Sequence, residues 1–255
     1  MKVCVISIDM LLNEPEHNRQ LIKQKILERP GFDLYVLPEY MTTGFVSDPT
    51  SCFETMEGAT VAFLKNLSQQ INAAICGTLI IKEDNNIFNR FVFVNKHKVA
   101  SYDKRHLFSP GNEHLKLSKP HQRVFVTYKN TKILLQICYD LRFPAFTHTY
   151  PDMIIWVANW PVQRITAWNT LLKARAIENQ CFVIGCNRVG TDQGLVYEAS
   201  SQVINYMGEA VVGEVVEAEL DFKGAAKFKE GFGAWRDADK VIIEGVEDVI
   251  IDMNE

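Results

Sequence analysis

The sequence has few cysteines, and none stands in a pattern typical of a disulfide scaffold or a zinc site. Its 6 cysteines lie at positions 4, 52, 76, 138, 181 and 186, far apart and without a CxxC pair. A disulfide-rich fold needs a denser set, and a structural zinc site needs closely spaced thiolate or imidazole ligands. We therefore expect a reduced, cytoplasmic protein in which a functional cysteine performs thiol chemistry and no metal is bound.

Basic charge and long apolar runs are also scarce. The 27 Lys and Arg residues are outnumbered by 31 Asp and Glu, which gives a formal net charge of −4. Without a basic surplus we expect no nucleic-acid binding. No apolar run reaches the ~18–20 residues that a membrane helix needs, so we expect no membrane association. Asp9 interrupts the apolar start of the chain, and we interpret that start as a core strand rather than a signal peptide.

Several well-known functional signatures are missing. The sequence contains no GxxxxGK[ST], no HExxH and no GxSxG, and Gly231-Phe232-Gly233 lacks both a third glycine and a preceding strand. These absences disfavour nucleotide-binding enzymes, zinc proteases and serine hydrolases.

What is present is an alternation of short apolar strands and amphipathic helices. Pro15 opens a helix that Pro30-Gly31 stops, and two further helices are expected near residues 61–71 and 168–179. Strands are expected near residues 3–8, 34–37, 74–81, 91–94, 124–127, 133–137, 154–158 and 181–186. Residues 202–205 and 210–216 are expected to form a hairpin, and residues 216–220 to continue the sheet. Because no linker interrupts this order, we predict one domain over 1–255, of the α/β class, with layered sheets and outer helices.

Three polar side chains follow apolar strands at the point where each strand ends. They are Glu39, Lys104 and Cys138. Strand ends in layered α/β folds expose reactive side chains and can converge. Taken singly, each has an ordinary alternative: a solvated carboxylate, a charged turn and an inert core thiol.

The surroundings of these residues resemble the signature blocks of the nitrilase superfamily of carbon–nitrogen hydrolases. The similar blocks are Val36–Glu39, Tyr102–Phe108, Ile137–Pro144, Val157–Pro161 and Ala174–Gln180. The resemblance spans residues 1 to about 238 and implies a four-layer α-β-β-α sandwich with no cofactor and a homodimer. It also implies catalytic roles: Cys138 as nucleophile, Glu39 as general base, Lys104 and the backbone N–H of Tyr139 as oxyanion partners, and Glu113 as a second carboxylate.

Within the superfamily, the amino-acid sequences of these blocks are most similar to those of small bacterial omega-amidases. Such an enzyme hydrolyses the distal amide of a dicarboxylic acid monoamide such as 2-oxoglutaramate, so its pocket must hold a remote carboxylate. Arg142 is a candidate clamp, although an ion pair with Asp140 or Glu178 is an equal alternative. Tyr40, Phe45 and Trp160 either line the pocket or pack in the core. Arg175 and Glu178, three apart on a helix, are expected to form a structural ion pair.

Other functions stay open at this level. The chain could hydrolyse an N-carbamoyl amino acid, a deaminated peptide amide or a nitrile, and weaker rivals are a non-catalytic binding protein and a redox thiol protein. One departure from the omega-amidases is the segment Tyr197–Ser201, where the family's serine is kept at Ser201 but the preceding turn differs. The acidic segment 241–255 lies beyond the resemblance and carries no assigned role.

Overall fold

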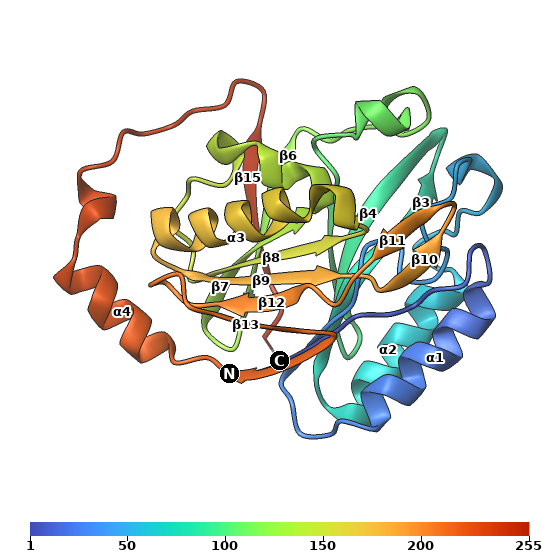
Figure 1. The fold of residues 1–255 in the computed structure, drawn as a ribbon, viewed down its shortest axis with the longest axis horizontal. Coiled ribbons are helices and arrows are strands. Elements are labelled where there is room, and N and C mark those ends of the chain that lie inside the picture. The colour runs from blue at the N-terminus through green and yellow to red at the C-terminus, as the bar shows by residue number, and fades with distance from the viewer. Residues whose placement is uncertain (255) are drawn as a thin grey trace.

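Two β-sheets packed face to face form the centre of the protein (Figure 1). The computed structural model describes residues 1–254. The first sheet has the order β14-β1-β2-β3-β4-β5, formed by β14 (Val215–Glu219), β1 (Lys2–Ile6), β2 (Leu34–Val36), β3 (Ala74–Glu83), β4 (Asn86–Asn95) and β5 (Lys98–Asp103). The second has the order β13-β12-β9-β8-β7-β6-β15, formed by β13 (Ala210–Gly213), β12 (Ser201–Ile204), β9 (Phe182–Asn187), β8 (Met153–Ala158), β7 (Thr131–Ile137), β6 (Gln122–Tyr128) and β15 (Glu247–Asp252).

Helices cover the outer face of each sheet, and this confirms the predicted four-layer sandwich. Helices α1 (Pro15–Leu27) and α2 (Ala59–Ile71) pack on the first sheet, and α3 (Ile165–Asn179) packs on the second. Strand β1 shows why, because its side chains alternate between the two faces. Val3 and Val5 face the second sheet, whereas Cys4 and Ile6 face α1 and α2.

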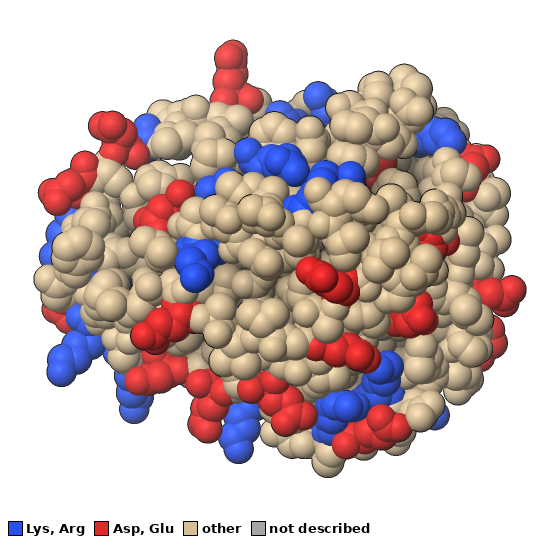
Figure 2. Space-filling view, in the orientation of Figure 1, with Lys and Arg blue, Asp and Glu red and all other residues tan. Residues whose placement is uncertain are grey.

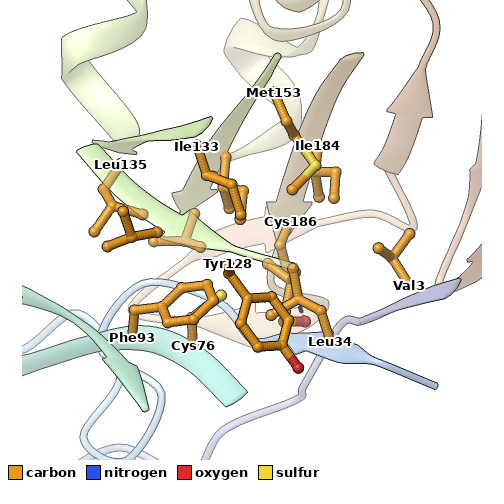
Figure 3. Packing of buried hydrophobic residues seen from close by; sticks show 14 of the residues in the cluster. Val3, Leu34, Cys76, Phe93, Tyr128, Ile133, Leu135, Met153, Ile184 and Cys186 are labelled. Carbon is orange, nitrogen blue, oxygen red and sulfur yellow. Dashed lines mark hydrogen bonds between the residues drawn. The ribbon is translucent and has the colours of Figure 1, made fainter. Parts of the chain in front are cut away.

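The space between the sheets is filled by apolar side chains from both of them. Figure 3 shows Val3, Leu34, Cys76 and Phe93 from the first sheet opposite Tyr128, Ile133, Leu135, Met153, Ile184 and Cys186 from the second. All are buried. This dry contact fixes the two sheets against each other, so residues at the ends of strands from different sheets keep a constant relative position.

The prediction of one strand over 210–216 is wrong. The chain leaves the second sheet at Gly213 and joins the first at Val215, where β14 pairs antiparallel with β1. Periodicity could not reveal the break, because both halves are short, apolar and extended.

The last part of the chain wraps around the outside of the sandwich. After α4 (Phe222–Gly231) it returns to the opposite edge of the second sheet, where β15 pairs parallel with β6 (Figure 1). Arg123 of β6 holds Asp248 of β15 through two hydrogen bonds, of 2.7 and 2.9 Å. The acidic segment therefore completes a sheet edge. No helix within residues 1–254 is both long and apolar enough to cross a bilayer.

Candidate active site

The three strand-end residues meet at one end of the sandwich. The Nζ of Lys104 lies 2.9 Å from Oε1 of Glu39, and both side chains are buried. Cys138 lies close enough that the charge of Glu39 raises the pKa of its thiol. Glu39 follows β2 and Lys104 follows β5 of one sheet, whereas Cys138 follows β7 of the other. The fold thus brings together residues that lie far apart in the sequence.

Local backbone geometry presents the thiol. Cys138 has φ of +42°, an uncommon conformation for a residue other than glycine, and it opens a 3₁₀ turn over Cys138–Arg142. The carboxylate of Asp140 holds this turn by accepting hydrogen bonds from the backbone N–H of Ile137 (3.1 Å) and of His106 (2.9 Å) and from Tyr102 Oη (2.9 Å). The strained backbone at the thiol is therefore fixed by a buried acid.

Two asparagines hold the Glu39 carboxylate, and the sequence did not single out either. Asn89 Nδ2 donates to Oε1 at 2.8 Å, and the backbone N–H of Asn159 donates to Oε2 at 2.9 Å. Asn159 Nδ2 also donates to the Glu39 carbonyl at 3.0 Å. Asn159 lies in one of the blocks that resemble the nitrilase superfamily, so its position could have indicated a role in the site. Asn89 lies inside β4, and nothing in the sequence around it indicated such a role.

Glu113 joins the cluster from the long polar segment between β5 and β6. Its Oε2 lies 2.9 Å from Lys104 Nζ and accepts the backbone N–H of Phe108 at 2.7 Å. Its Oε1 accepts the Tyr40 hydroxyl at 3.1 Å. Lys104 is thus held between two buried carboxylates.

These neighbours set the charge states of the cluster. Burial by itself would lower the pKa of Lys104, but the charges of Glu113 and Glu39 outweigh it, and the pKa is raised well above its usual value. Burial raises the pKa of the Cys138 thiol, Glu39 adds to the increase, and Lys104 opposes it. Both shifts favour a protonated lysine and a protonated thiol at neutral pH.

A small cavity of about 60 Å³ opens beside Cys138. Its lining includes Phe45, Lys104, Phe108, Cys138, Tyr139, Arg142, Asn159, Trp160, Arg164, Leu195 and Tyr197. Six of the predicted site residues thus lie on its wall: Lys104, Cys138, Tyr139, Arg142, Phe45 and Trp160. Tyr40 is not part of the lining described for residues 1–254 and instead contacts Glu113. Arg164, Leu195 and Tyr197 were not predicted from the sequence.

A hairpin that the sequence analysis did not identify closes one side of this cavity. It consists of β10 (Gly190–Asp192) and β11 (Leu195–Tyr197), and Gln193 Nε2 ties it to the Phe45 carbonyl at 2.6 Å. Arg188 supports it from behind, 3.1 Å from Asp192 and 4.6 Å from the centre of the Tyr197 ring. These contacts hold the hairpin in a fixed position beside the cavity.

The alternatives left open by the sequence are resolved for several residues. Arg175 pairs with Glu178 at 3.0 Å, which confirms the structural ion pair. Arg142 pairs with neither Asp140 nor Glu178; its guanidinium lies 5.1 Å from the centre of a Trp160 ring. Ser201 is buried and hydrogen-bonds to Ser7 (2.8 Å) and to the backbone N–H of Asn187 (2.9 Å), so it links the two sheets.

The four cysteines assigned to packing are all buried: Cys4, Cys76, Cys181 and Cys186. Cys52 lies partly exposed at the end of a 3₁₀ turn over Pro49–Ser51. Among residues 1–254, no group of three or more His, Cys, Asp or Glu side chains is arranged to hold a metal ion.

Comparison with known proteins agrees with this geometry. The sequence model of the carbon-nitrogen hydrolase family matches residues 2–226. The omega-amidase YafV of Escherichia coli K12 is 39% identical over 220 residues, which cover 82% of this chain and 86% of that protein. The 2-oxoglutaramate amidase of Bacillus subtilis is 29% identical over 252 residues, covering 93% and 97%.

A solved structure is similar over nearly the whole chain. XC1258 of Xanthomonas campestris, a CN-hydrolase superfamily protein, superposes with a TM-score of 0.92 at 34% identity, covering 95% of this chain and 98% of that one. The match in sequence and the match in architecture lead to one assignment. The chain belongs to the carbon-nitrogen hydrolase family.

Proposed function

We propose that the protein is an omega-amidase that hydrolyses the distal amide of 2-oxo dicarboxylic acid monoamides, with 2-oxoglutaramate and water giving 2-oxoglutarate and ammonia. The observation that carries this proposal is the cluster of buried Glu39, Lys104 and Glu113 with the half-buried Cys138, beside a small cavity lined by cations and aromatic rings. The names of similar proteins, omega-amidase and 2-oxoglutaramate amidase, support the choice of substrate.

The first half of the reaction forms a thioester. Cys138 Sγ attacks the amide carbon while Glu39 takes the thiol proton, which the raised thiol pKa makes necessary. The oxyanion forms beside Lys104 Nζ and the backbone N–H of Tyr139, and each such donor is worth about 10²–10³ in rate. Glu39 then returns the proton to the leaving nitrogen, the C–N bond breaks, and ammonia departs.

The second half regenerates the thiol. Glu39 takes a proton from water, the resulting hydroxide attacks the thioester carbon, and the C–S bond breaks. The proton passes back to Sγ and the carboxylic acid product leaves. Glu113 keeps Lys104 protonated and in place throughout, since it lies 2.9 Å from its Nζ.

The test is ammonia release from a panel of omega-amides by the wild type and by Cys138→Ala, with Cys52→Ala as a matched control at a thiol outside the cluster. We expect turnover of 2-oxoglutaramate by the wild type and the control and none by Cys138→Ala. N-carbamoyl amino acids and nitriles in the same panel test the rival substrates. Absence of turnover of every omega-amide would overturn the proposal.

Four further expectations stay predictions: one domain over 1–255, a homodimer, a cytoplasmic location and independence from cofactors. Light scattering on a sizing column measures the oligomer. Activity after exhaustive dialysis against a chelator tests the last of them.

A further inference from the structure

Tyr40, directly after Glu39, has an uncommon backbone conformation. Its φ is +52°, in the left-handed region that a bulky side chain rarely adopts. Its backbone N–H donates to Thr78 Oγ1 at 2.7 Å, and its carbonyl accepts the N–H groups of Thr43 at 3.1 Å and Gly44 at 2.9 Å. Such strain persists only where the surroundings impose it, and it is concentrated at functional sites. The direction that this conformation gives to the Tyr40 side chain therefore points to a role.

The hydroxyl of Tyr40 reaches the charge cluster. The residue is 3% exposed, and its Oη donates to Glu113 Oε1 at 3.1 Å. The same oxygen accepts a hydrogen bond from Lys104 Nζ at 3.1 Å. Burial raises the pKa of Tyr40 well above its usual value, and the charges of Glu113 and Glu39 raise it further. The hydroxyl therefore stays protonated and serves as a donor to the carboxylate.

Glu113 needs such contacts, because the segment that carries it has little regular structure. Between β5 and β6 the chain forms two short 3₁₀ turns, Ser109–Gly111 and Glu113–Leu115. Turns of this kind have weak internal hydrogen bonding and do not by themselves fix a side chain. The backbone N–H of Phe108 holds Oε2 of Glu113, and the Tyr40 hydroxyl holds Oε1. Both oxygens of the carboxylate are thus fixed by a donor outside these turns.

Burial gives this hydrogen bond more weight than a similar one at the surface. Figure 2 shows acidic and basic side chains interspersed over one face of the molecule, where water and salt screen them. The side chains of Glu113 and Lys104 are only 5% and 1% exposed. A donor to the carboxylate therefore acts with little screening. A displaced Glu113 carboxylate would also displace the lysine that it holds.

We propose that Tyr40 is a positioning residue, whose hydroxyl holds Glu113 where that carboxylate keeps Lys104 directed at the reacting carbonyl. The inference rests on the proposed thioester chemistry at Cys138 and adds to it a residue behind the oxyanion partner. Because Tyr40 acts on the transition state through Glu113, its contribution appears in kcat rather than in KM. Its ring lies 5.9 Å from the ring centre of Phe45, which lines the cavity, so a change that keeps the ring preserves this wall.

The experiment measures kcat and KM for ammonia release from 2-oxoglutaramate by the wild type, Tyr40→Phe, Glu113→Gln and the double variant. Tyr35→Phe is the matched control, because Tyr35 is 1% exposed and its hydroxyl donates to the Arg29 carbonyl, just after α1, at 2.5 Å. We expect Tyr40→Phe to lower kcat by about 10-fold with little change in KM, because one hydrogen bond to a charged group is lost. In the Glu113→Gln background the same change should lower kcat by only about 2- to 3-fold, since the acceptor there is a neutral amide. The control should keep the kcat of the wild type.

The outcomes distinguish this inference from the proposed function. If the wild type hydrolyses 2-oxoglutaramate, the role of Tyr40 is refuted by a wild-type kcat in Tyr40→Phe, by a change confined to KM, or by an equal fall in kcat in both backgrounds. A fall of the same size in Tyr35→Phe would also refute it, since any buried tyrosine would then give the same loss.

If the wild type hydrolyses a different linear amide instead, the proposed substrate is wrong, and the same variants measured on that amide decide the role of Tyr40. If the wild type releases ammonia from no amide, the proposed function and the inference are both overturned.

Discussion

Lys104 Nζ and Glu39 Oε1 lie 2.9 Å apart, and each side chain is only 1% exposed. A buried ion pair contributes little net stability, because desolvation of both charges offsets their attraction. Its place beside a thiol suits catalysis, since one partner can accept a proton and the other can stabilise an oxyanion. The pair therefore connects the ends of two strands of the first sheet, β2 and β5, to the proposed chemistry.

Replacement of Glu39 by Gln separates two effects of this carboxylate. We expect ammonia release to fall by about 10²–10⁴-fold, because the general base is lost. The negative charge of Glu39 also raises the pKa of Cys138, so the thiol of the variant becomes easier to ionise. The pH midpoint for alkylation of Cys138 by iodoacetamide, followed by mass spectrometry, should move to lower pH in the less active enzyme. Glu83→Gln, at an exposed carboxylate paired with Arg90, is the control. An unchanged midpoint would refute the coupling of Glu39 to the thiol.

Removal of Lys104 should reduce both rate and stability. Lys104→Gln deprives the oxyanion of one donor, worth about 10²–10³ in kcat. It also leaves Glu39 and Glu113 buried without their cation, and breaking such a pair costs about 3–5 kcal/mol of the free energy of unfolding. Urea unfolding and ammonia release, measured on the same preparation, check the two losses. Full stability with lost activity would contradict the electrostatic role of Lys104 in the fold.

The buried thiols make stability decline at alkaline pH. Burial raises the pKa of Cys76, Cys181 and Cys186 far above the ~8.5 of an unfolded cysteine. Below a pH of ~8.5 the thiols are protonated in both the folded and the unfolded protein, and the stability is at its full value. Above that pH, unfolding releases a proton from each of these cysteines. Each cysteine then lowers the free energy of unfolding by roughly 1.4 kcal/mol per pH unit. Urea unfolding between pH 9 and 10 under reducing conditions measures the slope. In Cys181→Ala the free energy of unfolding should fall less steeply with pH, by the roughly 1.4 kcal/mol per pH unit that one thiol contributes. The same pH dependence in the variant and the wild type would count against this explanation.

The C-terminal strand is expected to stabilise the sheet edge. Asp248→Asn weakens the two-point contact with Arg123 and should lower the free energy of unfolding by about 1 kcal/mol. Truncation after Gly245 removes β15 and exposes the edge of β6, which should cause a larger loss and promote association through that edge. Chemical unfolding and light scattering test both. A truncated chain as stable and monodisperse as a matched Asp248→Asn variant would contradict the role of β15.

Much of the site could be predicted because its residues follow recognisable strands. Glu39, Lys104 and Cys138 each come after a short apolar run, and the layered fold brings those ends together. Glu113 and Tyr139 were identified by resemblance, because nothing in the polar segment's own periodicity marks a carboxylate that will contact Lys104. The ion pair of Arg175 with Glu178 followed from helical spacing alone.

What the sequence did not reveal depends on contacts between distant segments. Asn89 is one polar residue in a long strand, and only its position opposite Glu39 gives it a role. The pairing partner of β15, which is β6, lies far earlier in the chain, so local pattern could not place β15. The β10–β11 hairpin pairs locally, but each of its strands has only 3 residues, too few for an alternating pattern. Arg164 precedes a helix like many surface residues, and its stacking on Phe108 appears only once the fold is formed.

The central claim is that Cys138 carries the acyl group during turnover. The most direct measurement is mass spectrometry of enzyme quenched in acid during steady-state hydrolysis of 2-oxoglutaramate, followed by peptide mapping. The account predicts an adduct of the 2-oxoglutaryl group, labile to hydroxylamine, on the peptide containing Cys138, and no adduct in Cys138→Ala. Full ammonia release by Cys138→Ala, or an adduct confined to another cysteine, would contradict it.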